Sequence, residues 1–259
     1  MIVRKQADGS LILIAQTNHA ELSGQFAANW GNDVFARPRP FQSVVRAAIY
    51  HDAGWYRYEA QPTYDVATKT TPNFPQVPAD PTQLAAYQWA IDWLTDIDPY
   101  AGLLISRHRT GLWSERYHTI SNPPLRQRGP LSELVTEFMK RNEARQEQAL
   151  ASLDRGEFAT NYHNLQIWDL LSLYLCSSEP KEQVVEPVPS GYGDQKGVRM
   201  LLNPIDAARI SIDPYPFVAR PLRVCYAYKL LATHDFPTEG AFLDAYYAAV
   251  PKTKYFEFV

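Results

Sequence analysis

The adjacent residues His51 and Asp52 are the strongest indication of chemistry in this sequence. An imidazole nitrogen and a carboxylate oxygen are ligands that divalent transition metals accept together. The pair follows the apolar segment 44–50 and precedes Gly54, and a glycine at positive φ is a common way to end a helix. The sequence therefore predicts a metal-binding pair at a helix C-terminus, with its other ligands on other buried helices.

Three further ligand candidates lie in segments with apolar periodicity. His19 is on the apolar face of a predicted helix, and His108 shares a face with Leu104, four residues earlier. Asp169 is the only charged residue of the apolar segment 165–175, and a buried carboxylate requires a metal or an arginine as partner. A lone histidine on such a face is usually an ordinary core residue, so the predicted metal site depends on all members together.

The rest of the sequence predicts the helices and strands that carry these residues. We expect helices over 17–30, 44–54, 81–96, 99–113, 131–154 and 162–176, a β-hairpin over 2–15, and strands near 198–202, 208–212, 222–228 and 255–259, with a short helix at 239–250. This order predicts a mainly α fold: a helical bundle with a small antiparallel β lobe, formed by the C-terminal part and the N-terminal hairpin. The corresponding predicted domains are 1–16, which joins the lobe, 17–178, which binds the metal, and 179–259, the lobe itself.

Composition limits the classes of function. Hydrophobic residues make up 46% of the 259 residues, enough for a substantial core. A net charge of −3 gives no electrostatic case for binding nucleic acid or an anionic membrane. The N-terminal segment lacks the features of a signal peptide, no apolar run approaches the ~20 residues of a membrane span, and both cysteines lie in apolar runs. We expect a soluble, cytoplasmic protein with reduced thiols.

The order of His19, the pair His51-Asp52 and the distant Asp169 resembles that of the HD superfamily of metal-dependent phosphohydrolases. The resemblance covers roughly residues 17–176. It implies an all-helical domain in which these four residues bind one divalent metal.

Members of that superfamily with two metals have additional histidines between the pair and the final aspartate. His108 is the better match here, and His118 is the weaker one. The implied cofactor is one or two ions of Fe, Mn, Zn, Ni or Co. The phrases around the candidate ligands are also similar to those of an uncharacterised bacterial family: His19-Ala-Glu-Leu-Ser-Gly, His51-Asp-Ala-Gly-Trp, Ser106-Arg-His and Asp169-Leu-Leu-Ser-Leu.

The chain departs from the HD pattern at Trp55. Many nucleotide-hydrolysing members have a phosphate-binding lysine three residues after the aspartate of the pair, where this chain has the tryptophan. Arg107, Arg57 or Arg37 would have to supply the positive charge instead. Trp55 could equally form the wall of a pocket for a less charged substrate.

Three functions follow as hypotheses. The first is a metal-dependent hydrolase of a small phosphorylated or otherwise anionic molecule, in which Asp52, His108 and Arg107 take part in catalysis. The second is a mixed-valent di-iron oxygenase, which would need both His108 and His118. The third is a metal-stabilised ligand-binding module without turnover. The expected partner is a small molecule, with no nucleic acid and no membrane, and the sequence is compatible with a homo-oligomer.

Overall fold

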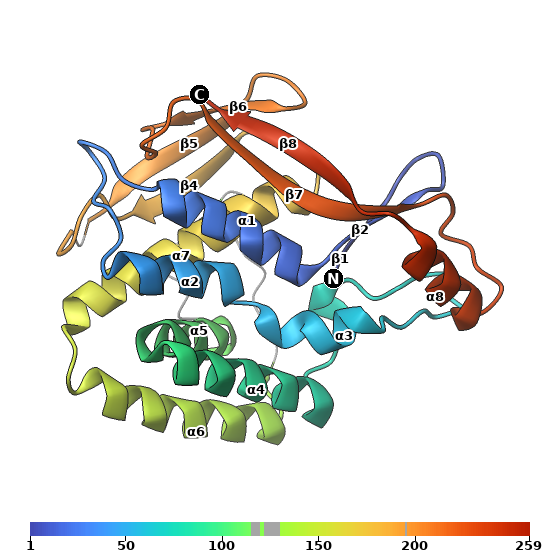
Figure 1. Cartoon of the computed structure of the whole chain (residues 1–259), viewed down its shortest axis with the longest axis horizontal. Coiled ribbons are helices and arrows are strands. Elements are labelled where there is room, and N and C mark those ends of the chain that lie inside the picture. The colour runs from blue at the N-terminus through green and yellow to red at the C-terminus, as the bar shows by residue number, and fades with distance from the viewer. Residues whose placement is uncertain (115–119, 122–129, 195) are drawn as a thin grey trace.

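The computed structural model describes residues 1–114, 120–121, 130–194 and 196–259. Its strands form one sheet in the order β1-β2-β7-β8-β6-β5-β4-β3, which lies along one side of the helices (Figure 1). The strands are β1 (Ile2–Lys5), β2 (Leu11–Ile14), β3 (Ile120–Ser121), β4 (Gln183–Val188), β5 (Val198–Pro204), β6 (Arg209–Asp213), β7 (Leu222–Leu231) and β8 (Lys252–Phe258).

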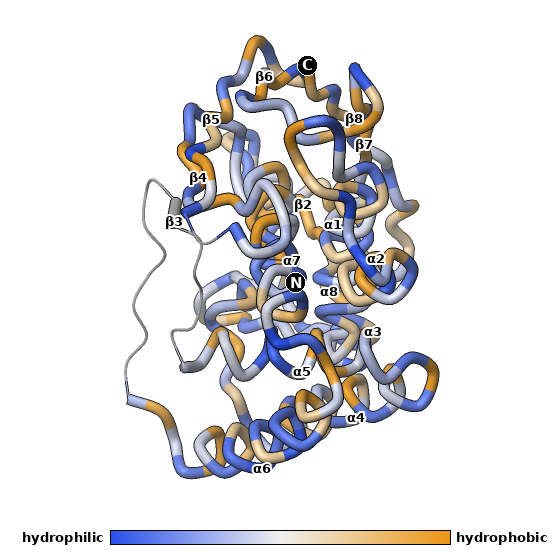
Figure 2. The backbone as a smooth tube through the Cα atoms, turned by 90° about the vertical axis from the view of Figure 1, so that its left-hand side faces the viewer, coloured by the Kyte–Doolittle hydropathy of each residue, from blue (hydrophilic) through white to orange (hydrophobic). Residues whose placement is uncertain are grey.

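The helices lie in successive layers below the sheet (Figure 1). They are α1 (Gln16–Asn29), α2 (Phe41–Tyr50), α3 (Tyr56–Ala60), α4 (Pro81–Ile97), α5 (Pro99–Trp113), α6 (Glu133–Leu150), α7 (Arg155–Cys176) and α8 (Glu239–Ala248), with short 3-10 helices η1 (Ala53–Trp55) and η2 (Phe74–Gln76). Helices α1 and α7 are next to the sheet, α2 and α5 follow, and α4 and α6 are farthest from it (Figure 1). Apolar and polar residues alternate along most elements (Figure 2).

The sheet is mixed and includes both ends of the described chain. Hairpin strand β2 pairs antiparallel with β7, so the N-terminal hairpin joins the C-terminal strands. The hairpin turn contains Gly9 at φ +85°, a conformation that favours glycine. Strands β6 and β8 run parallel, whereas the other paired strands are antiparallel.

The prediction of a mainly α fold is wrong, because the protein has an α/β fold. The sheet does not form a small lobe beside a closed bundle; it covers the apolar faces of α1 and α7. Phe26 of α1 stacks on Phe217 and meets Phe258 of β8 edge to face, with ring centroids 5.7 and 5.4 Å apart. Helices and sheet therefore share one hydrophobic core.

Two local differences from the predicted elements have clear causes. Strand β4 was not predicted because it contains Pro187, and proline is unusual within a strand since it removes a donor from the β-ladder. Helix α7 begins seven residues before its predicted start at 162, because Asp154 caps it by accepting hydrogen bonds from the amides of Gly156 and Glu157. The pattern had placed Asp154 inside the preceding helix, which in fact ends at Leu150.

A second apolar cluster fixes part of the segment between α3 and α4. Tyr64 stacks on Phe242 of α8 at 5.0 Å, and its hydroxyl donates to the carbonyl of His234.

Among the described residues, no helix is both long and apolar enough to cross a bilayer.

Candidate metal centre

Four helical segments bring the predicted ligands together. His19 comes from α1, His51 and Asp52 from the junction of α2 and η1, His108 from α5 and Asp169 from α7. All five side chains are buried, with residue exposures between 1 and 6%. The structure therefore assembles in one place residues that are up to 150 positions apart in the chain.

The chain turns at the His51-Asp52 pair for a reason other than the predicted one. Helix α2 ends at Tyr50 and the 3-10 helix η1 follows at Ala53. Gly54 does not have positive φ. A residue larger than glycine would clash at this position, because a Cβ there would lie 3.0 Å from the Cα of Tyr87 on α4. The glycine thus allows η1 to pack closely against α4.

The spacing of the ligand atoms suits a metal ion. One ligand atom from each of His19, His51 and Asp169 lies within 4.8 Å of the others, and the same holds for His51, Asp52 and His108. With metal–ligand bonds of about 2.1 Å, two ligands lie about 3.0 Å apart when adjacent and at most about 4.2 Å apart when opposite.

The individual distances fall inside this range. His19 Nε2 is 3.0 Å from Asp52 Oδ2, and His51 Nε2 is 3.5 Å from Asp169 Oδ1 and 3.9 Å from Asp52 Oδ2. His108 Nε2 is 3.9 Å from Asp169 Oδ2. Buried histidine and aspartate side chains in this arrangement could hold a metal ion.

Hydrogen bonds orient the two histidines of α1 and α2. His51 Nδ1 donates to the carbonyl of Ala48 at 2.9 Å, which directs Nε2 towards the carboxylates. Nε2 lies 3.5 Å from Asp169 Oδ1, close enough for an ion pair when the ring is protonated. His19 Nδ1 lies 2.7 Å from Ser172 Oγ, and Ser172 in turn donates to the carbonyl of Asp169. Since the hydroxyl proton is used there, His19 donates from Nδ1, and its Nε2 is directed at Asp52 Oδ2, 3.0 Å away. Two imidazole nitrogens directed at buried carboxylates are positions that a cation would bridge once the protons between them are displaced.

Asp52 is oriented through the start of α1. The side-chain amide of Gln16 donates to Asp52 Oδ2 at 3.0 Å. No side chain at the N-cap of α1 serves this helix; instead Glu59 of α3 accepts from the backbone amides of Gln16 and Thr17. Glu59 therefore fixes the helix end that carries Gln16, one turn before His19.

The environment of the cluster shifts the pKa values of His51 and His108 in opposite directions. Burial alone would lower the pKa of His51, but Asp169 and Asp52 outweigh it and raise the pKa to about 9. Burial and the neighbouring charge of His51 lower the pKa of His108 to about 4. Despite burial, the histidines hold the pKa of Asp169 at about 2 and that of Asp52 below its usual range. At neutral pH the metal-free cluster has a protonated His51, a neutral His108 and two carboxylates.

The other predicted site residues are not part of this cluster. Arg107 of α5 is half-buried and lies over the ring of Tyr162 at 5.8 Å. Trp55 is buried between Tyr58 and Tyr87, to which it packs edge to face. Arg57 and Arg37 are exposed.

The two exposed arginines each cover an aromatic ring. Arg57 lies over Trp89 at 5.6 Å and Arg37 over Phe41 at 4.1 Å, and no described contact joins either one to the metal-ligand candidates. His118 lies outside the described residues.

Sequence reasoning missed the supporting residues. Gln16 is three residues before His19 and Ser172 is three residues after Asp169, so both share a helix face with a predicted ligand. That spacing could have identified both residues from the sequence. No sequence pattern indicates Glu59, because it accepts from backbone amides of another helix.

Comparison with known proteins identifies the family. A family model described as a protein of unknown function, DUF3891, matches residues 1–233, and the chain belongs to this family. Searches of curated proteins and of solved structures found no match.

Proposed function

We propose that this DUF3891 protein is a metal-dependent hydrolase of a small phosphorylated or otherwise anionic molecule. The observation that carries the proposal is the buried convergence of three imidazoles and two carboxylates, with the Nε2 atom of His51 3.5 Å from Asp169 Oδ1. The order of these residues supports a distant relationship to the HD superfamily. A divalent ion in such a site supplies Lewis-acid polarisation and lowers the pKa of water towards about 7.

The chain's own residues would divide the work as follows. His19, His51, Asp52 and Asp169 hold the ion, and burial keeps these ligands in one geometry. His108 is neutral at pH 7 because its pKa is lowered to about 4, so its nitrogen is available as a ligand or hydrogen-bonding group.

Recognition of the substrate anion falls to an arginine. Trp55 is packed into the core, so nothing at that position replaces the phosphate-binding lysine of the HD pattern. Arg107 and Arg109 flank His108 on α5; Arg109 is buried against the rings of Tyr87 and Trp113, whereas Arg107 lines a pocket.

The second group of ligand atoms, from His51, Asp52 and His108, favours one alternative. A carboxylate can bridge two ions through its two oxygens, so Asp52, which lies beside His19, His51 and His108, would bridge the pair of ions that a di-iron oxygenase of the HD type requires. Iron at two equivalents, together with an oxygen-dependent optical change, would select this alternative over hydrolysis.

The test is elemental analysis of the protein purified without added metal and again after reconstitution. We expect at least one equivalent of a transition metal in the wild type and a large loss in Asp52→Asn. Asp98→Asn is the matched control, because Asp98 is also a buried carboxylate but pairs with Arg46 and caps α5. A wild type without stoichiometric metal would overturn the proposal. Metal without hydrolysis across phosphomonoesters and phosphodiesters would leave only a binding module.

A further inference from the structure

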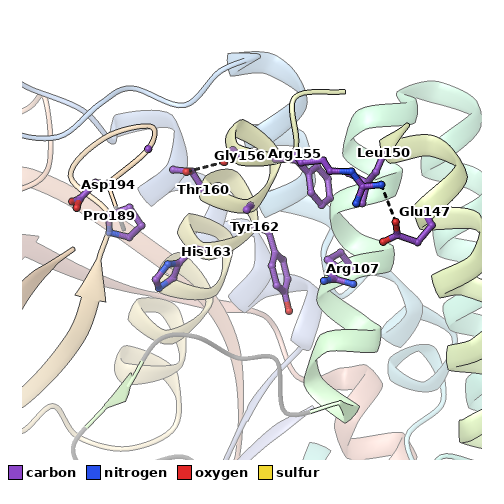
Figure 3. Close-up of a pocket in the computed structure, with 13 residues that line it drawn as sticks. Arg107, Glu147, Leu150, Arg155, Gly156, Thr160, Tyr162, His163, Pro189 and Asp194 are labelled. Atoms are coloured by element: carbon purple, nitrogen blue, oxygen red, sulfur yellow. Dashed lines mark hydrogen bonds and ion pairs between the residues drawn. The ribbon is translucent and has the colours of Figure 1, made fainter. Parts of the chain in front are cut away.

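A pocket of about 510 Å³ opens between α5, α6, α7 and the β4–β5 connection. Arg107 of α5 and Arg155, Tyr162 and His163 of α7 line it, with Asp194 on the opposite side (Figure 3). This volume is within the range of about 300–1,000 Å³ that small-molecule sites have.

The pocket shares its two main helices with the metal centre. Arg107 immediately precedes His108 on α5. Tyr162 is seven residues before Asp169 on α7, which places both on one helix face about 10 Å apart along the axis. The pocket and the metal centre are therefore built on the same two helices.

Two arginines and two carboxylates line the pocket, so an anion would bind there by replacing a partner of an arginine. The two carboxylates, Asp194 and Glu147, have partners of different kinds. Asp194 accepts from the amide and hydroxyl of Ser190 and from the amides that follow it. Glu147 pairs with Arg155 at 2.9 Å in an exposed ion pair, which contributes little and is readily exchanged for a ligand.

We propose that this pocket binds the phosphate group of the substrate through Arg107 and Arg155. The inference rests on the proposed hydrolase function and narrows the substrate to a small phosphorylated molecule. Guanidinium groups suit this role because their planar donors match phosphate oxygens in pairs. Tyr162 and His163 of α7 also line this pocket (Figure 3).

Titration of the metal-stripped full chain with inorganic phosphate tests the pocket apart from the metal. Calorimetry at low ionic strength should show saturable binding, weakened at least tenfold by Arg107→Gln and by Arg155→Gln. Arg155 is 61% exposed, so its substitution leaves the fold intact even if that of Arg107 does not. Arg145→Gln is the matched control, since Arg145 also forms an exposed ion pair, with Asp92 outside the pocket, and we expect less than a twofold change.

Three results of this titration would overturn the inference: no saturable phosphate binding, an equal loss in the Arg145 variant, or acetate binding as tightly as phosphate. Metal content of the same preparations separates the two proposals. Stoichiometric metal without phosphate binding refutes the pocket alone. Phosphate binding that needs both arginines, in a protein that takes up no metal, refutes the hydrolase and leaves a phosphate site.

Discussion

Replacing Asp169 by asparagine removes one negative charge from the centre with little change in size. Its carboxylate lies 3.5 Å from His51 Nε2, 3.8 Å from His19 Nδ1 and 3.9 Å from His108 Nε2. The pKa of Asp169 is lowered from 3.8 to about 2, so the folded protein favours its ionised form. At about 1.4 kcal/mol per unit, this interaction stabilises the metal-free protein by about 2 kcal/mol at neutral pH. We expect Asp169→Asn to lose that amount.

The effect on metal binding should be larger and separable. Loss of one of four or five ligands should weaken binding at least ~100-fold, which corresponds to about 2.7 kcal/mol of ligand-induced stabilisation. For a chain of this size, 1 kcal/mol shifts Tm by about 2–4 °C. The metal-induced increase in Tm should therefore be about 5–10 °C smaller in Asp169→Asn than in the wild type.

The assay is thermal denaturation of chelator-stripped protein with and without each of Mn²⁺, Fe²⁺, Co²⁺, Ni²⁺ and Zn²⁺. The difference between stripped samples reports the lost charge interaction, and the difference in metal-induced shift reports the lost ligand. Asp98→Asn is expected to retain the full metal-induced shift, because Asp98 caps α5 outside the cluster. An unchanged shift and unchanged metal stoichiometry in Asp169→Asn would remove Asp169 from the site and refute the reasoning.

Three further predictions use the same centre. Because the pKa of His51 is raised to about 9, its ion pairs stabilise the metal-free protein fully below about pH 6.5 and are lost as pH rises through 9. Metal must displace that proton, so its affinity in a chelator competition should rise about tenfold per pH unit from 7 to 9, and a flat profile would exclude His51 as a ligand. Ser172→Ala should weaken metal binding about 10–100-fold by releasing His19, whereas Ser106→Ala, another buried serine, should leave metal titrations unchanged. Trp55→Ala should cost about 3–5 kcal/mol in urea denaturation at constant metal content, and loss of metal would instead place the indole in the site.

The convergence of the five candidate ligands was predictable because each member carried its own local signal. His19, His108 and Asp169 are polar residues on apolar helix faces, and such residues need buried partners. His51 and Asp52 are adjacent at the end of an apolar segment, where a nitrogen ligand and an oxygen ligand can serve one ion. The structure brings all five together.

The fold class was not predictable from the same patterns. An apolar helix face indicates that the face is buried, but it does not tell whether helices or a sheet pack against it. The face of α1 that includes Phe26 indicated a core, and we assigned that core to other helices, whereas Phe217 and Phe258 cover it. The pairing of β2 with β7 and the parallel pairing of β6 with β8 join residues that are distant in the chain, and strand patterns alone do not specify register across such distances.

The low exposure of the five side chains would limit the substrates of the proposed hydrolase. No ligand candidate is more than 6% exposed, so a folded protein or a nucleic acid duplex could not bring a reacting bond to these atoms as described. Under the proposed function, the substrate would therefore be a small molecule held by a neighbouring binding site. In the pocket, Arg107 is adjacent in sequence to His108 and Tyr162 is two turns before Asp169, and the volume suits a small molecule. The absent lysine and the arginine pocket are thus explained together: the phosphate of the substrate would be bound from α5 and α7, rather than from the segment that follows His51-Asp52.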